Sequence, residues 1–229
     1  MYDGIFFINH ALNVSQLSVF NNHQRFDQTL DTLRTIDDKC PNNLKIIFDN
    51  SPGSIEEDKL KMIGNWPNTW FIEMGKVERV KFLSEHGLRS LAETWSFMGM
   101  LEWFKEQGFK SNRIYKLSGR YRLSDDFVLD DPSYKDAFVF STALDSWMPE
   151  SQQKEAGVKK LYRLRCWHMD YSLLDTFIEA LPKVFEDCSM YHIDVEHAYY
   201  KHLHTNKVIE VPKIGVTGYI APSGEYIDE

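Results

Sequence analysis

Residues 115–123 read Tyr115-Lys116-Leu117-Ser118-Gly119-Arg120-Tyr121-Arg122-Leu123, a strand-like run that opens onto a turn of small residues with a fixed positive charge. The run lies about halfway along an alternating pattern of strands and helices. In sheets of that kind ligands bind at the carboxyl ends of the strands, so Ser118, Gly119 and Arg120 are placed to meet a substrate. Gly119 permits close backbone approach, and Arg120 offers a planar fork of donors suited to phosphate. The structural alternative is a hairpin turn with a solvated arginine.

Buried strands and amphipathic helices alternate on the amino-terminal side of this run. The apolar patterns predict strands at 5–8, 45–48 and 69–72, and helices at 26–36, 54–63 and 88–107, the second of them capped by Ser54 and Glu57. Alternation of this kind favours a mostly parallel sheet with helices on both faces. We therefore expect an α/β, Rossmann-like fold.

The carboxyl-terminal part of the chain has a mixed pattern. It predicts strands at 113–117, 137–140, 161–167, 208–211 and 214–220, and helices at 171–185 and 194–202. We expect a single domain over residues 1–229. Its first part, residues 1–130, would hold a nucleotide, and residues 131–229 would hold a second substrate.

Composition excludes several classes of protein. The 229 residues are 43% hydrophobic and 14% aromatic, which excludes a disordered chain, and the net charge of −8 argues against a nucleic-acid partner. Cys40, Cys166 and Cys188 are widely spaced and suggest neither a disulfide framework nor a zinc site. Since there is no signal sequence and no apolar run of the ~20 residues needed for a membrane span, we expect a soluble protein of a reducing compartment.

Polar residues follow the first two predicted strands. Asp49 ends a buried strand and leads into a turn, where a carboxylate can accept hydrogen bonds from a ribose or a base. The structural alternative is an Asx-turn that serves its own backbone. Asn9 and His10 leave the first strand in the same way, and both strand ends would lie side by side.

Two charged residues stand four apart at the start of the long predicted helix. Arg89 precedes Glu93, which is the less favourable order for a helix pair and puts a cation at the positive end of the helix dipole. An anion held between Arg89 and the helix N-terminus would explain the placement. A solvated surface arginine is the alternative.

The segment His192-Ile193-Asp194-Val195-Glu196-His197 gathers ionisable groups at a predicted helix start. Asp194 suits an N-cap and Glu196 a first-turn position, so a structural role explains both. In a functional role, one of them is a general base for a substrate hydroxyl. His168 and Asp170 could line the same cleft, although their spacing matches no established metal site.

Three common signatures are absent from the sequence: the P-loop, the glycine-rich dinucleotide fingerprint and the G-x-S-x-G nucleophile turn. Their absence disfavours P-loop NTPases, dinucleotide oxidoreductases and α/β-hydrolases.

Taken in order, three segments resemble glycosyltransferases of the GT-A fold. They are residues 25–30 with Thr35-Ile36, residues 45–51, and residues 116–121. The pattern is similar to that of viral and bacterial sugar transferases that build surface glycans, including lipopolysaccharide-synthesis proteins. The resemblance covers roughly residues 5–130, and beyond that it rests on the order of elements and on residues 194–200.

The resemblance implies a role for most of the candidate residues. The first two strand ends bind the nucleotide in this family, which carries over to His10 and Asp49. The helix before the central motif contributes to the diphosphate or sugar, which carries over to Arg89 and Glu93. The central motif is usually Asp-x-Asp, whose carboxylates hold a divalent metal.

Here Ser118-Gly119-Arg120 takes the place of that metal-binding motif. An arginine neutralises the same phosphates, so no metal is required in this interpretation. The alternative is Mn²⁺ or Mg²⁺ held in a shifted site by Asp125 and Asp126.

We therefore expect a transferase that moves a sugar, of hexosyl type, from a nucleotide diphosphate sugar to a carbohydrate hydroxyl. Arg89 and Arg120 would stabilise the leaving diphosphate, and Glu196 or Asp194 would deprotonate the acceptor. The acceptor would lie near Trp167 and His168, where an aromatic face could stack on the sugar.

Two rival functions stay open, a nucleotidyltransferase and a non-catalytic carbohydrate-binding module on the same fold. The expected location is the cytoplasm, or the host cytoplasm if the protein is viral.

Overall fold

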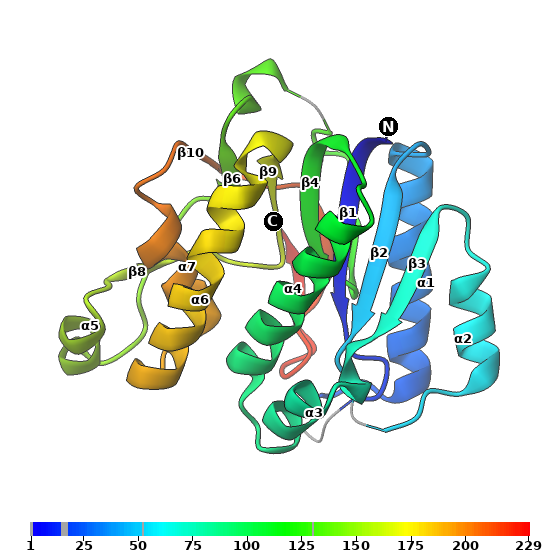
Figure 1. Ribbon diagram of the computed structural model, residues 1–229, viewed down its shortest axis with the longest axis horizontal. Coiled ribbons are helices and arrows are strands. Elements are labelled where there is room, and N and C mark those ends of the chain that lie inside the picture. Colours follow the sequence, from blue (N-terminus) through cyan, green and yellow to red (C-terminus); the bar gives the residue numbers. More distant parts are fainter. Residues whose placement is uncertain (1, 15–17, 52, 130) are drawn as a thin grey trace.

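The computed structural model describes residues 2–14, 18–51, 53–129 and 131–229 (Figure 1). Its centre is a seven-stranded sheet of order β10-β6-β9-β4-β1-β2-β3. The strands are β1 (Tyr2–His10), β2 (Leu44–Asp49), β3 (Thr69–Glu73), β4 (Ser111–Ser118), β6 (Phe138–Ser141), β9 (Cys166–Asp170) and β10 (Val208–Val211). Strand β9 runs antiparallel to both of its neighbours, and the other paired strands are parallel. The expected α/β fold with a mostly parallel sheet is confirmed.

The helices and the smaller sheets complete the fold. The helices are α1 (Asn22–Lys39), α2 (Glu57–Gly64), α3 (Glu78–Glu85), α4 (Arg89–Glu106), α5 (Glu150–Ala156), α6 (Leu174–Tyr191) and α7 (Val195–Leu203), with short 3₁₀ turns at Met74–Lys76, Pro132–Tyr134 and Tyr171–Leu173. A three-stranded sheet joins β5 (Tyr121–Leu123), β11 (Val216–Tyr219) and β12 (Tyr226–Asp228), and a two-stranded one joins β7 (Leu144–Asp145) and β8 (Lys160–Leu161).

Alternation along the buried strands divides the core into two layers. In β1, Ile5 and Phe7 face the layer that contains apolar residues of α3, α4, α6 and α7, whereas Phe6 and Ile8 face the layer that contains those of α1. Successive side chains of a strand point to opposite faces, so a continuous apolar run is what a strand covered on both faces requires. In Figure 1, α4 and α6 cross one face of the sheet and α1 lies on the other side of β2 and β3.

The carboxyl ends of the parallel strands meet at one edge of the sheet, which is the lower edge in Figure 1. His10 is in register with Asp49, and Asn9 with both Phe48 and Ser118. Helices α1, α4 and α7 begin after a strand or loop at this edge, so their N-terminal turns face the same region. The fold thus brings together residues that are far apart in the chain.

Some local expectations were wrong. Helix α2 starts after Glu56 without a side-chain cap, so Ser54 and Glu57 form no capping box, and α3 and α5 were not expected. The single strand expected at 161–167 is divided between β8 and β9. Strand β8 pairs with β7 outside the central sheet, and the segment between β8 and β9 carries two arginines, Arg163 and Arg165, that bind the buried carboxylate of Glu229.

Helix α6 continues past its expected end to Tyr191, with Pro182 inside it. Among the helices that the structure describes, none is both long and apolar enough to cross a membrane.

Candidate active site at the carboxyl edge of the sheet

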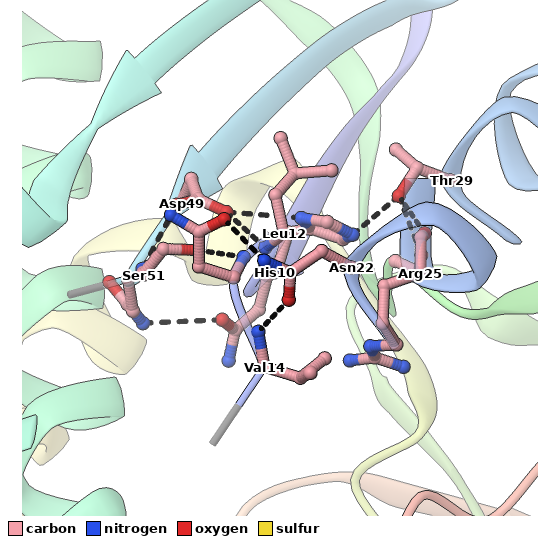
Figure 2. Close-up of polar contacts among 12 residues, drawn as sticks. His10, Leu12, Val14, Asn22, Arg25, Thr29, Asp49 and Ser51 are labelled. Atoms are coloured by element: carbon pink, nitrogen blue, oxygen red, sulfur yellow. Dashed lines mark hydrogen bonds and ion pairs between the residues drawn. The ribbon is translucent and has the colours of Figure 1, made fainter. Parts of the chain in front are cut away.

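The carboxylate of Asp49 is fully engaged with its own protein (Figure 2). Its Oδ2 accepts a hydrogen bond from the backbone N–H of Leu12 at 2.8 Å and lies 3.1 Å from His10 Nδ1, while Oδ1 accepts from the backbone N–H of Ser51 at 2.9 Å. Burial alone would raise the pKa of Asp49, but these hydrogen bonds hold it below its ordinary value. The contact with Ser51 is the Asx-turn that was the structural alternative for this residue.

His10 is equally buried and lies between Asp49 and α1. Its Nε2 is hydrogen-bonded to the hydroxyl of Thr29, whose oxygen also lies 2.9 Å from the carbonyl oxygen of Arg25. Burial lowers the pKa of His10 despite the neighbouring carboxylate, so the ring is neutral at physiological pH. With only 4% of His10 and 1% of Asp49 exposed, this pair supports the loop after β1 rather than presenting a free polar surface.

The turn Ser118-Gly119-Arg120 packs directly onto the end of β1. The backbone N–H of Gly119 donates to the carbonyl of Asn9 at 2.8 Å, and that of Ser118 donates to the carbonyl of Arg165 at 2.8 Å. A Cβ atom at Gly119 would lie 2.3 Å from Cδ2 of His10. Only glycine lets the turn approach this closely, and the approach fixes where Arg120 leaves the backbone.

Two guanidinium groups lie next to one another beside this turn. Arg25 is 5% exposed, and Arg120 is half-buried with its guanidinium 4.9 Å from the centre of the Tyr121 ring. Burial, and then the positive charge of Arg120, lower the pKa of Arg25 to about 10. The positive charges of Arg25 and Arg120 also contribute to the lowered pKa of His10, so the three side chains form one cluster.

The two guanidinium groups are incompletely satisfied within the protein. Arg25 Nη1 donates to Gln28 at 3.1 Å, yet the buried Nε atoms of Arg25 and Arg120 have no hydrogen-bond partner. Within the described part of the chain, neither forms an ion pair with a carboxylate within 4 Å. Two neighbouring guanidinium groups that have unsatisfied N–H donors and no ion pair within 4 Å are suited to bind an anion.

A second polar cluster lies on the α4 side of the sheet. Lys116 of β4 is 4% exposed, and its Nζ lies 3.1 Å from Glu93 Oε1 and donates to the carbonyl of Leu164 at 2.6 Å. Burial would raise the pKa of Glu93, but the Lys116 ammonium, together with a hydrogen bond from Asn9, holds it below its ordinary value.

A row of hydrogen-bonded polar side chains continues from this cluster along the ends of the strands. Asn50 Nδ2 donates to Asn9 at 3.3 Å, and the hydroxyl of Ser96 donates to Asn50 at 2.6 Å.

Glu196 lies in the first turn of α7 and close to this cluster. Burial, and then the negative charge of Glu93, raise the pKa of Glu196 to about 7. Its neighbour Asp194 is the exposed N-cap residue of α7 and makes no side-chain cap hydrogen bond. A carboxyl group whose pKa lies near 7 is suited to accept a proton from a substrate hydroxyl.

Trp167 and His168 lie inside the molecule. Trp167 is fully buried and packs against Phe140 and Phe177, while His168, 2% exposed, lies on the opposite face of β9 beside Tyr115. Burial, and then the charge of Arg113, lower the pKa of His168 to about 3. The expected acceptor face at these two residues is therefore wrong, because their strand is covered on both sides and neither ring reaches the surface.

Arg89 and Glu93 of α4 differ in their surroundings. Arg89 is exposed on the first turn of α4, whereas Glu93 forms its ion pair with Lys116.

The sequence prediction missed Arg25 and Lys116 as parts of the site. Arg25 could have been found from its position, because it stands four residues before Thr29 and so lies on the buried face of α1, where a charged side chain is unusual. The signal for Lys116 was its charge, which interrupts the apolar run of residues 114–117.

No family model matches the sequence, and no curated protein does. Among solved structures, the chain is similar to the WbbM bifunctional glycosyltransferase, with a TM-score of 0.52 and 11% identity over 92% of this chain and 38% of that one. It is similar to the galactosyltransferase LgtC in complex with donor and acceptor sugar analogues, with a TM-score of 0.50 and 11% identity over 90% of this chain and 72% of that one.

An active-site mutant of LgtC matches with a TM-score of 0.52 and 9% identity, again over 90% of this chain and 72% of that one. The chain has the GT-A fold, as the resemblance implied. It spans 38% of the WbbM chain.

The residues at the end of β4 do not fit the divalent metal that this fold often holds. Ser118-Gly119-Arg120 supplies no carboxylate there, and Arg25 and Arg120 already bring positive charge. Asp125 and Asp126 are exposed and lie 2.8 Å from Lys39 and 3.1 Å from Lys213, respectively. Across residues 2–14, 18–51, 53–129 and 131–229, no three His, Cys, Asp or Glu side chains are grouped to hold a metal.

Proposed function

We propose that the protein transfers a sugar from a nucleotide diphosphate sugar to a hydroxyl group of a carbohydrate acceptor. The observation that carries the proposal is the pair Arg25 and Arg120 at the carboxyl edge of the sheet, whose Nε atoms have no hydrogen-bond partner and which form no ion pair within 4 Å among the described residues. Ligands bind at this edge in open α/β sheets, and the N-terminus of α1 adds the positive end of a helix dipole. A diphosphate could accept hydrogen bonds from both guanidinium groups and lie at the N-terminus of α1.

The leaving diphosphate is the group whose charge grows during sugar transfer. Arg25 and Arg120 are preorganised, because Arg25 is buried in the first turns of α1 and Arg120 leaves a turn that is packed on β1. Cations fixed in this way stabilise developing negative charge without reorganising at the moment of reaction. The same two residues would thus fill the role that a divalent metal has elsewhere in this fold.

Glu196 is the proposed general base. Its pKa of about 7 lets it hold a proton taken from the acceptor hydroxyl, and Glu93 is prevented from competing for that proton by its ion pair with Lys116. The polar chain of Asn9, Asn50 and Ser96 is the proposed contact for the donor sugar, because its amides and hydroxyl match sugar hydroxyls.

In this proposal the part before residue 131 holds the donor and the part after it holds the acceptor, and the sugar is a hexose. We also propose a reducing compartment, the cytoplasm of the cell or of a host, because the three cysteines are buried and free.

The test is nucleotide binding by calorimetry in the presence of EDTA, with UDP, GDP and their sugar conjugates as probes. We expect at least one of these to bind, Arg120→Lys to weaken binding because it loses the bidentate fork, and Arg120→Ala to weaken it further. Arg34→Ala is the matched control, since Arg34 is an exposed arginine of α1 paired with Asp31. Binding that requires Mn²⁺ and is unchanged in Arg120→Ala would overturn the diphosphate site.

The rival functions give different results in the same experiment. A nucleotidyltransferase would bind a nucleoside triphosphate with Mg²⁺ more strongly than a nucleotide sugar. A carbohydrate-binding module would bind glycans and none of the nucleotides.

A further inference from the structure

Trp147 is the most exposed large hydrophobic side chain among the described residues, with 63% of its surface open to solvent. It lies in the loop between β7 and α5, a few residues after the carboxyl end of β6. The loop therefore lies on the same edge of the sheet as the site. Nothing in the fold requires a large aromatic ring to face water at this position, since burial of such a ring is strongly favourable.

Hydrogen bonds hold the loop on both sides of Trp147. The backbone N–H of Ser146 donates to the carbonyl of Lys159 at 2.8 Å, and that of Met148 donates to the hydroxyl of Ser146 at 3.1 Å. The amide of Gln153 donates to the carbonyl of Met148 at 2.7 Å. The backbone that carries the exposed ring is thus fixed, which lowers the entropy cost of binding a ligand against it.

The indole ring is also oriented by its one described ring contact. It meets the ring of His197 edge to face, with the centroids 5.2 Å apart. His197 is fully buried and is held by the hydroxyl of Ser146 at 2.9 Å from Nε2. The contact leaves most of the indole surface open to solvent.

His197 links Trp147 to the candidate base. It follows Glu196 in the first turn of α7, and Asp194 is close enough to act electrostatically on it. A rigid, exposed aromatic face suits a pyranose ring, whose C–H groups pack on it, and the helix start that the ring contacts through His197 carries two carboxylates, Asp194 and Glu196, that can accept hydrogen bonds from sugar hydroxyls. Trp70, which is also exposed, lacks this setting, because it lies at the amino end of β3, on the opposite edge of the sheet, and packs against Trp103.

We propose that Trp147 is the platform on which the acceptor sugar stacks, with its reacting hydroxyl turned toward Glu196. The proposal rests on the proposed transferase function. It replaces the acceptor face expected at Trp167, and it assigns the acceptor the chemistry of a pyranoside with one face free of axial hydroxyls.

The first test observes the indole N–H signals of isotope-labelled tryptophan in the whole protein by NMR. Trp147→Phe identifies the Trp147 signal, and Trp70→Phe identifies that of the matched control. The probes are methyl glycosides of galactose, glucose and mannose. We expect at least one probe to shift the Trp147 signal in a saturable manner and to leave the Trp70 signal in place. No shift with any probe, or equal shifts of both signals, would overturn the proposal.

The second test compares variants. Trp147→Tyr should keep the affinity for the active glycoside within a few fold, and Trp147→Ala should weaken it by about tenfold or more. Trp70→Ala should have no effect. UDP and GDP binding must stay at the parent level in Trp147→Ala, because the diphosphate site lies elsewhere.

The two proposals fail in different ways. If the parent protein binds no nucleotide, the transferase function fails, whereas glycoside binding at Trp147 would still be observed. If nucleotide binds and the Trp147 signal does not move, only the acceptor platform fails.

Discussion

Lys116 Nζ and Glu93 Oε1 lie 3.1 Å apart, in an ion pair that joins β4 to α4 within the site. The pair gives two nearby carboxyl groups opposite behaviour. Lys116 holds the pKa of Glu93 below its ordinary value, whereas burial and the charge of Glu93 raise that of Glu196 to about 7. Neighbouring groups whose pKa values are pushed apart are typical of acid–base sites.

The first prediction concerns pH. Because Glu196 must be ionised to accept a proton, transfer activity should fall as pH decreases below about 7. Glu93→Gln removes the neighbouring negative charge and frees Lys116, so both changes favour ionised Glu196. The acid limb of the pH–rate profile should therefore move to lower pH in Glu93→Gln. A profile with an unmoved limb would show that Glu196 does not control it.

The second prediction separates catalysis from stability at Glu196. Glu196→Gln should lower turnover by ~10²–10⁴-fold and leave nucleotide affinity unchanged. Asp194→Asn is the matched control, since Asp194 is exposed at the same helix start.

The same substitution should stabilise the fold at alkaline pH. Between pH 4.5 and about pH 7, Glu196 keeps its proton in the native state and has lost it in the unfolded state. The parent protein therefore loses stability as the pH rises through this window. Glu196→Gln has no such loss. Its Tm should match that of the parent near pH 4.5 and exceed it above pH 7. Equal Tm values above pH 7 would contradict the raised pKa.

The third prediction concerns the like-charged pair. Arg25→Ala and Arg120→Ala should each weaken binding of a nucleoside diphosphate, and the double variant should lose less than the sum of the two, because both contact one anion. Arg25→Ala should also leave the apo protein nearly as stable as the parent, since removal of Arg25 relieves repulsion from Arg120. Calorimetry and thermal unfolding measure the two effects. Full additivity would place the two arginines in separate sites.

The fourth prediction concerns Gly119. In Gly119→Ala the added Cβ would meet the His10 ring at 2.3 Å, so the turn or the ring must move. A clash of this kind in a packed region costs roughly 1–3 kcal/mol. We expect a lower Tm together with weaker nucleotide binding, because the same turn positions Arg120. Gly64→Ala is the control, since a Cβ there meets no atom within 4 Å. A stable variant with parental binding would show that the turn does not position Arg120.

Local pattern was sufficient for much of the fold. The apolar runs at 5–8 and 45–48 are buried on both faces, and the expected strands and long helices form β1, β2, β3, α1 and α4 close to their predicted bounds. Strand and helix periodicity are properties of consecutive residues, so a sequence displays them directly. The placement of His10, Asp49 and Ser118 at one edge also followed, because parallel strands end together.

Only the tertiary structure decided which polar and aromatic residues are available for chemistry. Sequence pattern does not distinguish Trp167 from Trp147, yet the first is fully buried and the second is 63% exposed. The pairing of Arg25 with Arg120, and of Glu93 with Lys116, joins elements far apart in the chain. Burial and through-space charge depend on packing between elements, so the free cations, the raised pKa of Glu196 and the exposed indole appear only when the chain is folded.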